Sequence, residues 1–171
     1  MLHTSNDIKY PGLRTLPPGV ERYFVKGGGL SLIEISHEDK IEIINEEGKQ
    51  ICEIVVFDSK GKSDLSILNL KENASAEFSK KTISQDEKIT KLLKKKKLDL
   101  GKAKSCIIFN QDCLMGERIT LTSKDKCTVM IAAPGEAMNV HDQNPPTDLT
   151  IFLTKAKFIE RDEQFILPDP L

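Results

Sequence analysis

The sequence has no tryptophan, only three histidines and no excess of charge of either sign. Its 25 basic and 26 acidic residues leave a net charge of −1, which offers no general attraction for nucleic acid or for an anionic lipid surface. No apolar run approaches the length of a membrane span, and the amino-terminal residues MLHTSNDIKYPG lack the basic and apolar regions of a secretory signal. We therefore expect a cytoplasmic protein that binds neither nucleic acid nor membrane.

Several motifs of catalytic and metal sites are also absent. No C-x-x-C pair exists, and no G-x-S-x-G motif marks a serine nucleophile. Gly27–Gly29 lacks both the G-x-G-x-x-G spacing and the Lys-Ser/Thr of a phosphate-binding loop, so it predicts a turn between strands. With so few histidines a self-contained catalytic centre is not expected, and no residue is assigned a catalytic or metal-binding role.

The four cysteines are scattered, and three of them lie in or beside apolar runs, which is typical of reduced intracellular thiols. Cys113 differs because it lies in the polar turn Asn110–Gly116, where neighbouring carboxylates are expected to raise its pKa. These cysteines are Cys52, Cys106, Cys113 and Cys127.

What the sequence does contain is a series of short apolar runs of strand length. A chain of 171 residues suits one domain with a real core. The expected strands are Glu21–Val25, Leu30–Ile35, Ile41–Asn45, Gln50–Phe57, Ser105–Phe109, Arg118–Thr122, Cys127–Ala133 and Leu149–Phe158. We predict a mainly β (α+β) fold, a β-sandwich or barrel of about eight strands with a helical insertion at about residues 64–100.

Within that insertion the spacing of the apolar residues changes from every second residue, as in a strand, to every third or fourth, as in a helix. Asp64 can cap a short helix, and Ser84–Glu87 has the capping-box pattern of a second helix start. Ile89 follows at helical spacing, and Lys94–Lys97 suit the final turn, where we expect a solvated face rather than a polyanion site.

The clearest local signal is a hairpin. Ile41–Asn45 and Gln50–Phe57 are β-branched runs that flank a short loop, and Gly48 in that loop can take a positive φ. The second run begins with alternation and ends fully apolar, which predicts a strand that finishes in the centre of a sheet.

The predicted boundaries are an extended amino-terminal arm at 1–19, a single β-rich domain at 20–158 and a linker at 159–171. Pro11, Pro17 and Pro18 prevent regular hydrogen bonding in the arm. The final residues carry Pro168 and Pro170, and this composition predicts a linker towards a C-terminal module that the sequence lacks.

The segment from Pro134 to Asp148, between two predicted strands, is the candidate binding site. Loops of this length are uncommon in compact domains unless they are functional or packed by their own side chains. Its ligand-binding candidates are Glu136, Met138, Asn139, His141, Asp142, Gln143 and Asp148. His141 and Asp142 are the pair best suited to act as a general base or as metal ligands. Adjacent residues of an extended segment point to opposite sides, however, which favours a structural or solvated role for them.

Four stretches carry a resemblance to a known family. They are Glu47–Gln50, Gly116–Thr122, Val129–Gly135 and Gln143–Leu149. Together they resemble the N-terminal accessory domain of fusion proteins in which a glycine-cleavage T-protein-like, folate-dependent aminomethyltransferase follows, and they are similar to the urea carboxylase-associated domains. The similarity extends from about Pro17 to Phe158.

The resemblance implies an accessory, non-catalytic domain that packs against or gates the folate-dependent module. Tetrahydrofolate would then bind in the C-terminal aminomethyltransferase module, and this domain would hold no cofactor. Some urea carboxylase-associated relatives have a His-Asp pair followed by a cysteine suited to metal binding. Here Cys127 precedes His141 and Asp142, so that order is not reproduced.

Two alternatives remain open. The first is a small-molecule or metal-dependent enzyme of the urea carboxylase-associated type that uses Glu136, His141 and Asp142. The second is a module that senses a small metabolite with the same loop as its lid.

Overall fold

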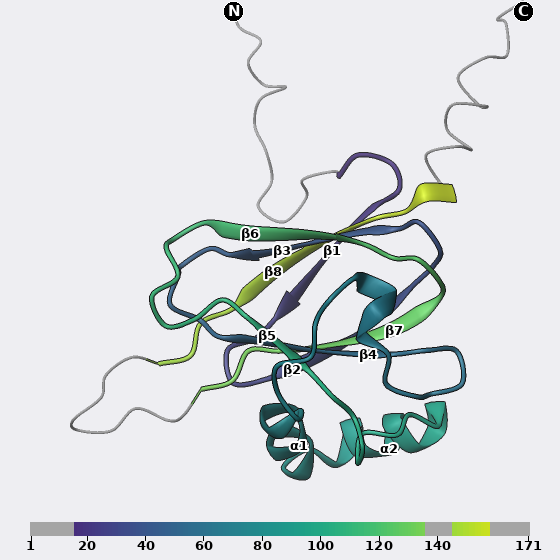
Figure 1. Ribbon diagram of the computed structural model, residues 1–171. Coiled ribbons are helices and arrows are strands. Elements are labelled where there is room, and N and C mark those ends of the chain that lie inside the picture. Colours follow the sequence, from purple (N-terminus) through teal and green to yellow (C-terminus); the bar gives the residue numbers. More distant parts are fainter. Residues whose placement is uncertain (1–15, 136–144, 158–171) are drawn as a thin grey trace, which may run out of the picture.

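The computed structural model describes residues 16–135 and 145–157 (Figure 1). The described chain forms two four-stranded antiparallel sheets and a helical layer. Its elements are β1 (Val20–Val25), β2 (Leu30–Ile35), β3 (Lys40–Asn45), β4 (Cys52–Phe57), the 3₁₀ helix η2 (Leu65–Leu68), α1 (Glu77–Ser84), α2 (Glu87–Lys96), β5 (Cys106–Ile108), β6 (Glu117–Thr122), β7 (Cys127–Ala132) and β8 (Leu149–Thr154). None of the helices in these ranges is long and apolar enough to cross a membrane.

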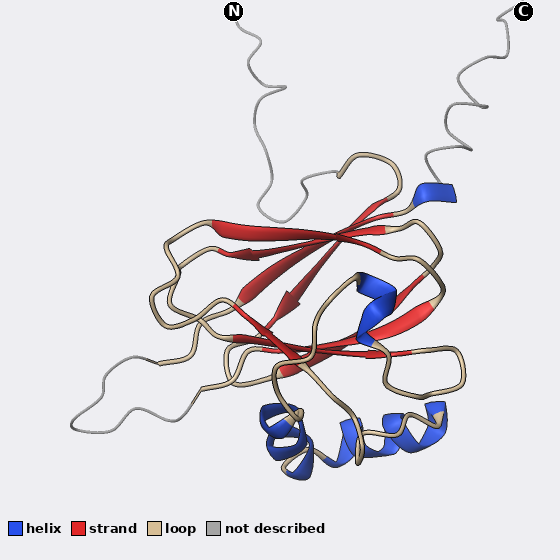
Figure 2. Ribbon diagram, viewed as in Figure 1, coloured by secondary structure: helices blue, strands red, loops and turns tan. Residues whose placement is uncertain are grey.

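The strand order identifies the architecture as a β-sandwich. Sheet A has the order β1-β8-β3-β6, and sheet B has the order β2-β7-β4-β5. The two sheets lie face to face, and both helices lie beyond sheet B (Figure 2). The predicted mainly β fold with a helical insertion is therefore confirmed.

The core between the sheets follows from the two-residue period of the strands. On β3 the side chains of Ile41 and Ile43 point inward, and on β4 those of Ile54 and Val56 do the same, all with no exposed surface. Burial of each such side chain stabilises the fold by roughly 1.5–3 kcal/mol. Helix η2 adds apolar side chains to the same core.

A second apolar cluster lies on the other face of sheet B. Val55 and Phe57 of β4 and Met130 of β7 pack there with Ile83 of α1 and Leu93 of α2. Strand β4 is therefore buried at all six positions, which explains why all of them except Glu53 are apolar. It lies between β7 and β5 in sheet B, but β5 pairs only with its first three residues, Cys52–Ile54, so its beginning rather than its end is central.

The predicted hairpin is wrong. β3 belongs to sheet A and β4 belongs to sheet B, so the loop between them crosses from one sheet to the other. Gly48 has the expected positive φ of 76°, and a Cβ there would lie 2.8 Å from the Cys113 carbonyl oxygen. The glycine is thus needed for a close approach between two loops as well as for a turn.

The helical insertion contains one helix that the sequence analysis did not find. Ser84 was predicted to cap a helix, but it is the last residue of α1, and Asp86 caps α2 by accepting hydrogen bonds from the backbone N–H groups of Lys88 and Ile89. Lys97, with φ 57°, ends α2. The lysines of the final turn are largely exposed, as expected for a solvated face.

Helix α1 receives its amino-terminal cap from sheet B. Ala76, the residue before the helix, has no side chain that can cap it. Instead the Glu53 carboxyl Oε1 of β4 accepts hydrogen bonds from the Ser79 backbone N–H at 2.9 Å and from the Ser79 hydroxyl at 2.7 Å. A buried polar side chain in the centre of sheet B therefore ties the helical layer to the sandwich.

Candidate functional site

Most of the predicted site residues lie outside the described residues. Of the seven candidates, only Asp148 is described, and Glu136, Met138, Asn139, His141, Asp142 and Gln143 are not. Asp148 Oδ1 accepts a hydrogen bond of 2.8 Å from the Gly27 backbone N–H. Its carboxyl group therefore fixes the point where the candidate segment enters β8. The predicted arm is described only from residue 16, and the predicted linker is not described.

The Gly27–Gly29 turn packs directly against the base of the candidate segment. A Cβ at Gly27 would lie 2.5 Å from the Pro146 carbonyl oxygen, which leaves no room for any side chain. On the other side of the base, the Gly28 N–H donates to the Ala133 carbonyl oxygen at 2.7 Å, and the Ala133 N–H donates to the Gly29 carbonyl oxygen at 3.0 Å. The turn between strands is confirmed, and its glycines allow the two ends of the segment to come close.

Gln50 connects the two ends of the segment. Its side-chain Nε2 donates to the Pro134 carbonyl oxygen at 2.7 Å, and its Oε1 accepts from the Thr147 N–H at 2.8 Å. The side chain is 4% exposed, so these hydrogen bonds are shielded from water. Gln50 is not among the predicted site residues, because both of its partners lie far away in the sequence.

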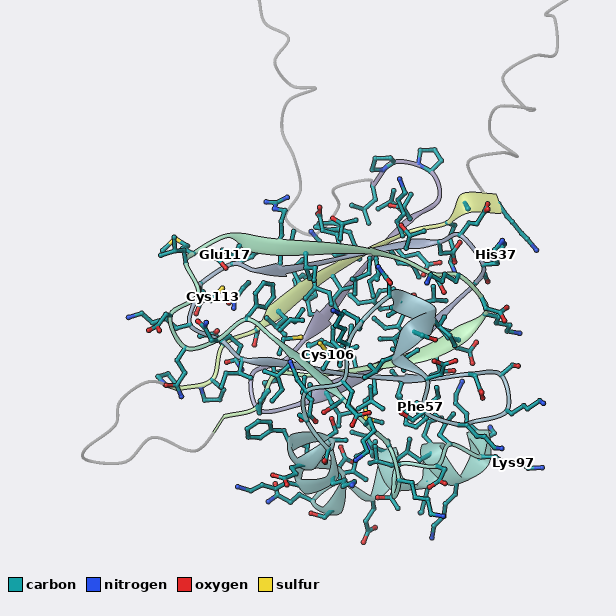
Figure 3. The ribbon with its side chains drawn as sticks, viewed as in Figure 1. His37, Phe57, Lys97, Cys106, Cys113 and Glu117 are labelled. Atoms are coloured by element: carbon teal, nitrogen blue, oxygen red, sulfur yellow. The ribbon has the colours of Figure 1, made fainter. Side chains whose placement is uncertain are left out.

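A polar cluster continues from Gln50 towards the β5–β6 loop. Asn45 Nδ2 donates to the Gln50 carbonyl oxygen at 2.7 Å and lies 3.4 Å from Cys113 Sγ. The Cys113 thiol in turn donates to Glu117 Oε2 at 3.2 Å. Figure 3 shows Cys113 and Glu117 side by side at the end of the sandwich from which the candidate segment emerges. We call Asn45, Gln50, Cys113, Glu117 and Thr147 the end cluster.

The thiol of this cluster is not activated. Burial, followed by the hydrogen bond to Glu117 and its negative charge, raises the pKa of Cys113 to about 11. The direction agrees with the expectation from carboxylate neighbours, but Cys113 itself is only 5% exposed, although the other residues of its turn are exposed. Burial also raises the pKa values of the Cys52, Cys106 and Cys127 thiols. Nucleophilic or metal-ligating chemistry needs the thiolate, which burial here disfavours.

Two atoms of the end cluster have unused hydrogen-bonding capacity. Asn45 Oδ1 and Thr147 Oγ1 are buried and have no hydrogen-bond partner among the described residues. A buried unpaired polar group costs about 1–3 kcal/mol, so a small polar ligand that met these two atoms would recover that free energy. The cluster therefore leaves two buried polar atoms unpaired, whereas it offers no activated nucleophile.

The metal-ligating residues of the described ranges are dispersed. Within residues 16–135 and 145–157, no group of three or more His, Cys, Asp or Glu side chains converges. A cavity of about 210 Å³ lies at the opposite end of the sandwich and is lined by side chains of both charges, among them Glu34, Asp58, Lys96 and Lys126. Glu34 and Lys96 form an ion pair with each other.

Comparison with known proteins gives one informative match. No protein-family model matches the chain. The chain is 33% identical over 168 residues to the trimethylamine-oxide aldolase of Ruegeria pomeroyi, and this match covers 96% of the chain and 21% of the relative. The chain therefore spans about a fifth of the length of this curated relative. Over nearly its whole length, it is similar to a domain-sized part of a larger enzyme.

Proposed function

We propose that this chain is an accessory, non-catalytic domain of a T-protein-like aminomethyltransferase, which packs against or gates the folate-dependent module. The observation that carries the proposal is the match of almost the whole chain to one fifth of a much longer enzyme. A domain of that kind works through its contacts with neighbouring modules, and the described residues hold no activated thiol and no converging metal ligands.

The chemistry in the relative's name is compatible with this assignment. All carbon atoms of trimethylamine oxide are methyl groups on nitrogen, and a T-protein-like aminomethyltransferase also acts on one-carbon groups carried by nitrogen. Tetrahydrofolate would be the cofactor of the neighbouring module. In this domain the Gln50 contacts and the Gly27–Gly29 turn would hold the 134–148 segment in place for contact with that module.

The test is a domain exchange in the Ruegeria pomeroyi enzyme. One variant lacks the fifth that matches this chain, and a chimera carries this chain in its place. We expect the deletion to lower aldolase activity or thermal stability and the chimera to restore it. A deletion variant with unchanged activity, stability and substrate affinity would refute the proposal.

A matched pair of substitutions in the chimera tests the role of the segment. Gln50→Ala removes the side chain that joins Pro134 to Thr147, whereas Lys91→Ala changes an exposed residue of α2. We expect Gln50→Ala to reduce the restored activity and Lys91→Ala to leave it unchanged. Equal activities of the two variants would mean that the segment does not contribute.

A second candidate function is small-molecule or metal binding of the urea carboxylase-associated type. The unpaired Asn45 Oδ1 and Thr147 Oγ1 atoms at the base of the segment favour it. A ligand at one hundred times its dissociation constant would stabilise the chain by about 2.7 kcal/mol. Thermal unfolding of the chain with trimethylamine oxide, tetrahydrofolate or Zn²⁺ measures this directly, and an unchanged Tm with all three would count against binding of these probes.

A further inference from the structure

The outer face of sheet A differs from the outer face of sheet B. Both α1 and α2 lie on sheet B, and neither covers the outer face of sheet A (Figures 1 and 2). In an antiparallel sheet that faces water, the outward positions are ordinarily polar. Sheet A follows this rule at most of its outward positions, but Phe24, Ile44 and Phe152 are apolar exceptions.

The strand register gathers apolar side chains in the middle of that face. One row across the sheet contains Phe24, Thr150, Ile44 and Arg118. The next outward row contains Arg22, Phe152, Glu42 and Thr120. Ile44 is only 6% exposed and Thr150 only 4%, so the accessible apolar surface of these rows comes from Phe24 and Phe152. The outer patch is defined as Phe24, Phe152, Arg22 and Arg118.

The exposure and charges of the outer patch resemble those of a protein contact surface. Phe24 is 56% exposed, although it is a large aromatic residue. The Arg22 guanidinium lies 5.2 Å from the centroid of the Phe24 ring, and Arg118 Nη1 lies 3.6 Å from Glu42 Oε1. Aromatic residues and arginine dominate the binding energy of protein interfaces. The complementary surface therefore needs an apolar centre and a carboxylate opposite Arg22.

The size of the face suits a contact between domains of one chain. Four strands about 4.8 Å apart, each of six residues at about 3.3 Å, cover roughly 400 Å² per partner. The total of roughly 800 Å² is below the 1,200–2,000 Å² of stable complexes between separate proteins but within the 600–1,500 Å² of contacts between domains of one chain. A tethered partner fits because the tether supplies an effective concentration of millimolar order.

We propose that the outer patch is the docking surface for a neighbouring module of the same polypeptide, whose contact face has an apolar centre and a carboxylate that pairs with Arg22. This inference rests on the proposed accessory function, since it names the surface through which the domain meets the rest of the enzyme. A second copy of the chain is the competing occupant.

The buried cysteines permit a direct test. All four are between 0 and 7% exposed, so an introduced surface cysteine is the fast-reacting thiol of the folded chain. Thr120→Cys places a thiol at an exposed position beside the outer patch, and Lys91→Cys places a matched thiol on the exposed side of α2. Each variant is prepared as the isolated chain and within the Ruegeria pomeroyi chimera, and the rate of modification by Ellman's reagent is measured.

Docking predicts that Thr120→Cys reacts about tenfold or more slowly in the chimera than in the isolated chain, because thiol modification depends on access. Lys91→Cys should react at the same rate in both, and Phe152→Asp in the chimera should restore the fast rate at Thr120→Cys. Equal rates for Thr120→Cys in both proteins would overturn the proposal. A rate that falls as the concentration of the isolated chain rises would also overturn it, in favour of a second copy.

This readout is independent of activity. A chimera that protects Thr120→Cys but shows no dependence of activity on the domain would refute the proposed function and leave the docking surface in place. A chimera whose activity requires the domain, with no protection at Thr120→Cys, would place the contact elsewhere on the domain.

Discussion

Substitution of Gly27 by alanine tests the base of the candidate segment most directly. The added methyl group would lie 2.5 Å from the Pro146 carbonyl oxygen and 2.6 Å from the Pro146 carbonyl carbon, both of them backbone atoms. Gly27 is not among the glycines with a positive φ, so the alanine backbone itself is not strained. Any loss of stability must therefore come from displacement of the segment.

The expected magnitude combines three contributions. Overpacking of a closely fitted contact costs about 1–3 kcal/mol. Weakening of the hydrogen bond from the Gly27 N–H to Asp148 adds about 1 kcal/mol. Alanine recovers about 0.4–1 kcal/mol by restricting the unfolded chain. The net loss is about 1–3.5 kcal/mol, which corresponds to a fall in Tm of about 2–14 °C for a chain of this length.

The assay is urea denaturation followed by far-ultraviolet circular dichroism, because the chain has no tryptophan for fluorescence. Gly101→Ala is the matched control, since the nearest atom to its Cβ would be Asp99 Oδ1 at 3.5 Å. We expect this control to be unchanged or stabilised by up to about 1 kcal/mol. A Gly27→Ala variant as stable as Gly101→Ala would show that Pro146 does not pack against the glycine turn.

Three further predictions concern the helical layer and the thiols. Ser79→Ala should lower the free energy of unfolding by about 1–2 kcal/mol, because it removes the hydroxyl hydrogen bond to Glu53. Ser84 is exposed, so the control Ser84→Ala should change the free energy of unfolding by less than about 0.5 kcal/mol in the same urea titration. Leu93→Ala should cost about 2–4 kcal/mol because it leaves a cavity under α2, and a value below 1 kcal/mol would mean that α2 is not held by this contact. The pKa of Cys113 rises on folding from 9.0 to about 11, so its stabilising effect is complete below pH 9 and is lost as the pH rises towards 11. Between pH 9 and 11 the Cys113→Ala variant should therefore lose less stability than the unsubstituted chain. Equal losses in the two proteins would contradict a raised pKa at Cys113.

The sequence located the strands well because the two-residue period is a local signal. Every expected strand overlaps an observed one, although β4 begins at Cys52 and β8 ends at Thr154 rather than at Phe158. The partners of the strands were not predictable in the same way. Ile41–Asn45 and Gln50–Phe57 have the local features of a hairpin, but their pairing depends on distant strands, namely β6 and β8 for the first and β5 and β7 for the second.

The missed helix and the missed site residues share one cause, which is dependence on distant partners. Helix α1 has no capping side chain of its own, and Glu53, which supplies the cap, is 26 residues away from Ser79. Gln50 contacts Pro134 and Thr147, which are 84 and 97 residues away. The sequence identified the 134–148 segment by its composition but contained no local sign of the residue that joins its ends.

The Gln50 hydrogen bonds hold the two ends of the 134–148 segment and do not involve the residues in its middle. The two anchor points stay at a fixed spacing whatever residues lie between them, and each doubling of loop length costs only about 0.6 kcal/mol in closure entropy. The sandwich should therefore accept segments of other lengths and compositions between Gly135 and Pro146, which themselves pack closely, and this would make the domain a scaffold for grafted binding loops.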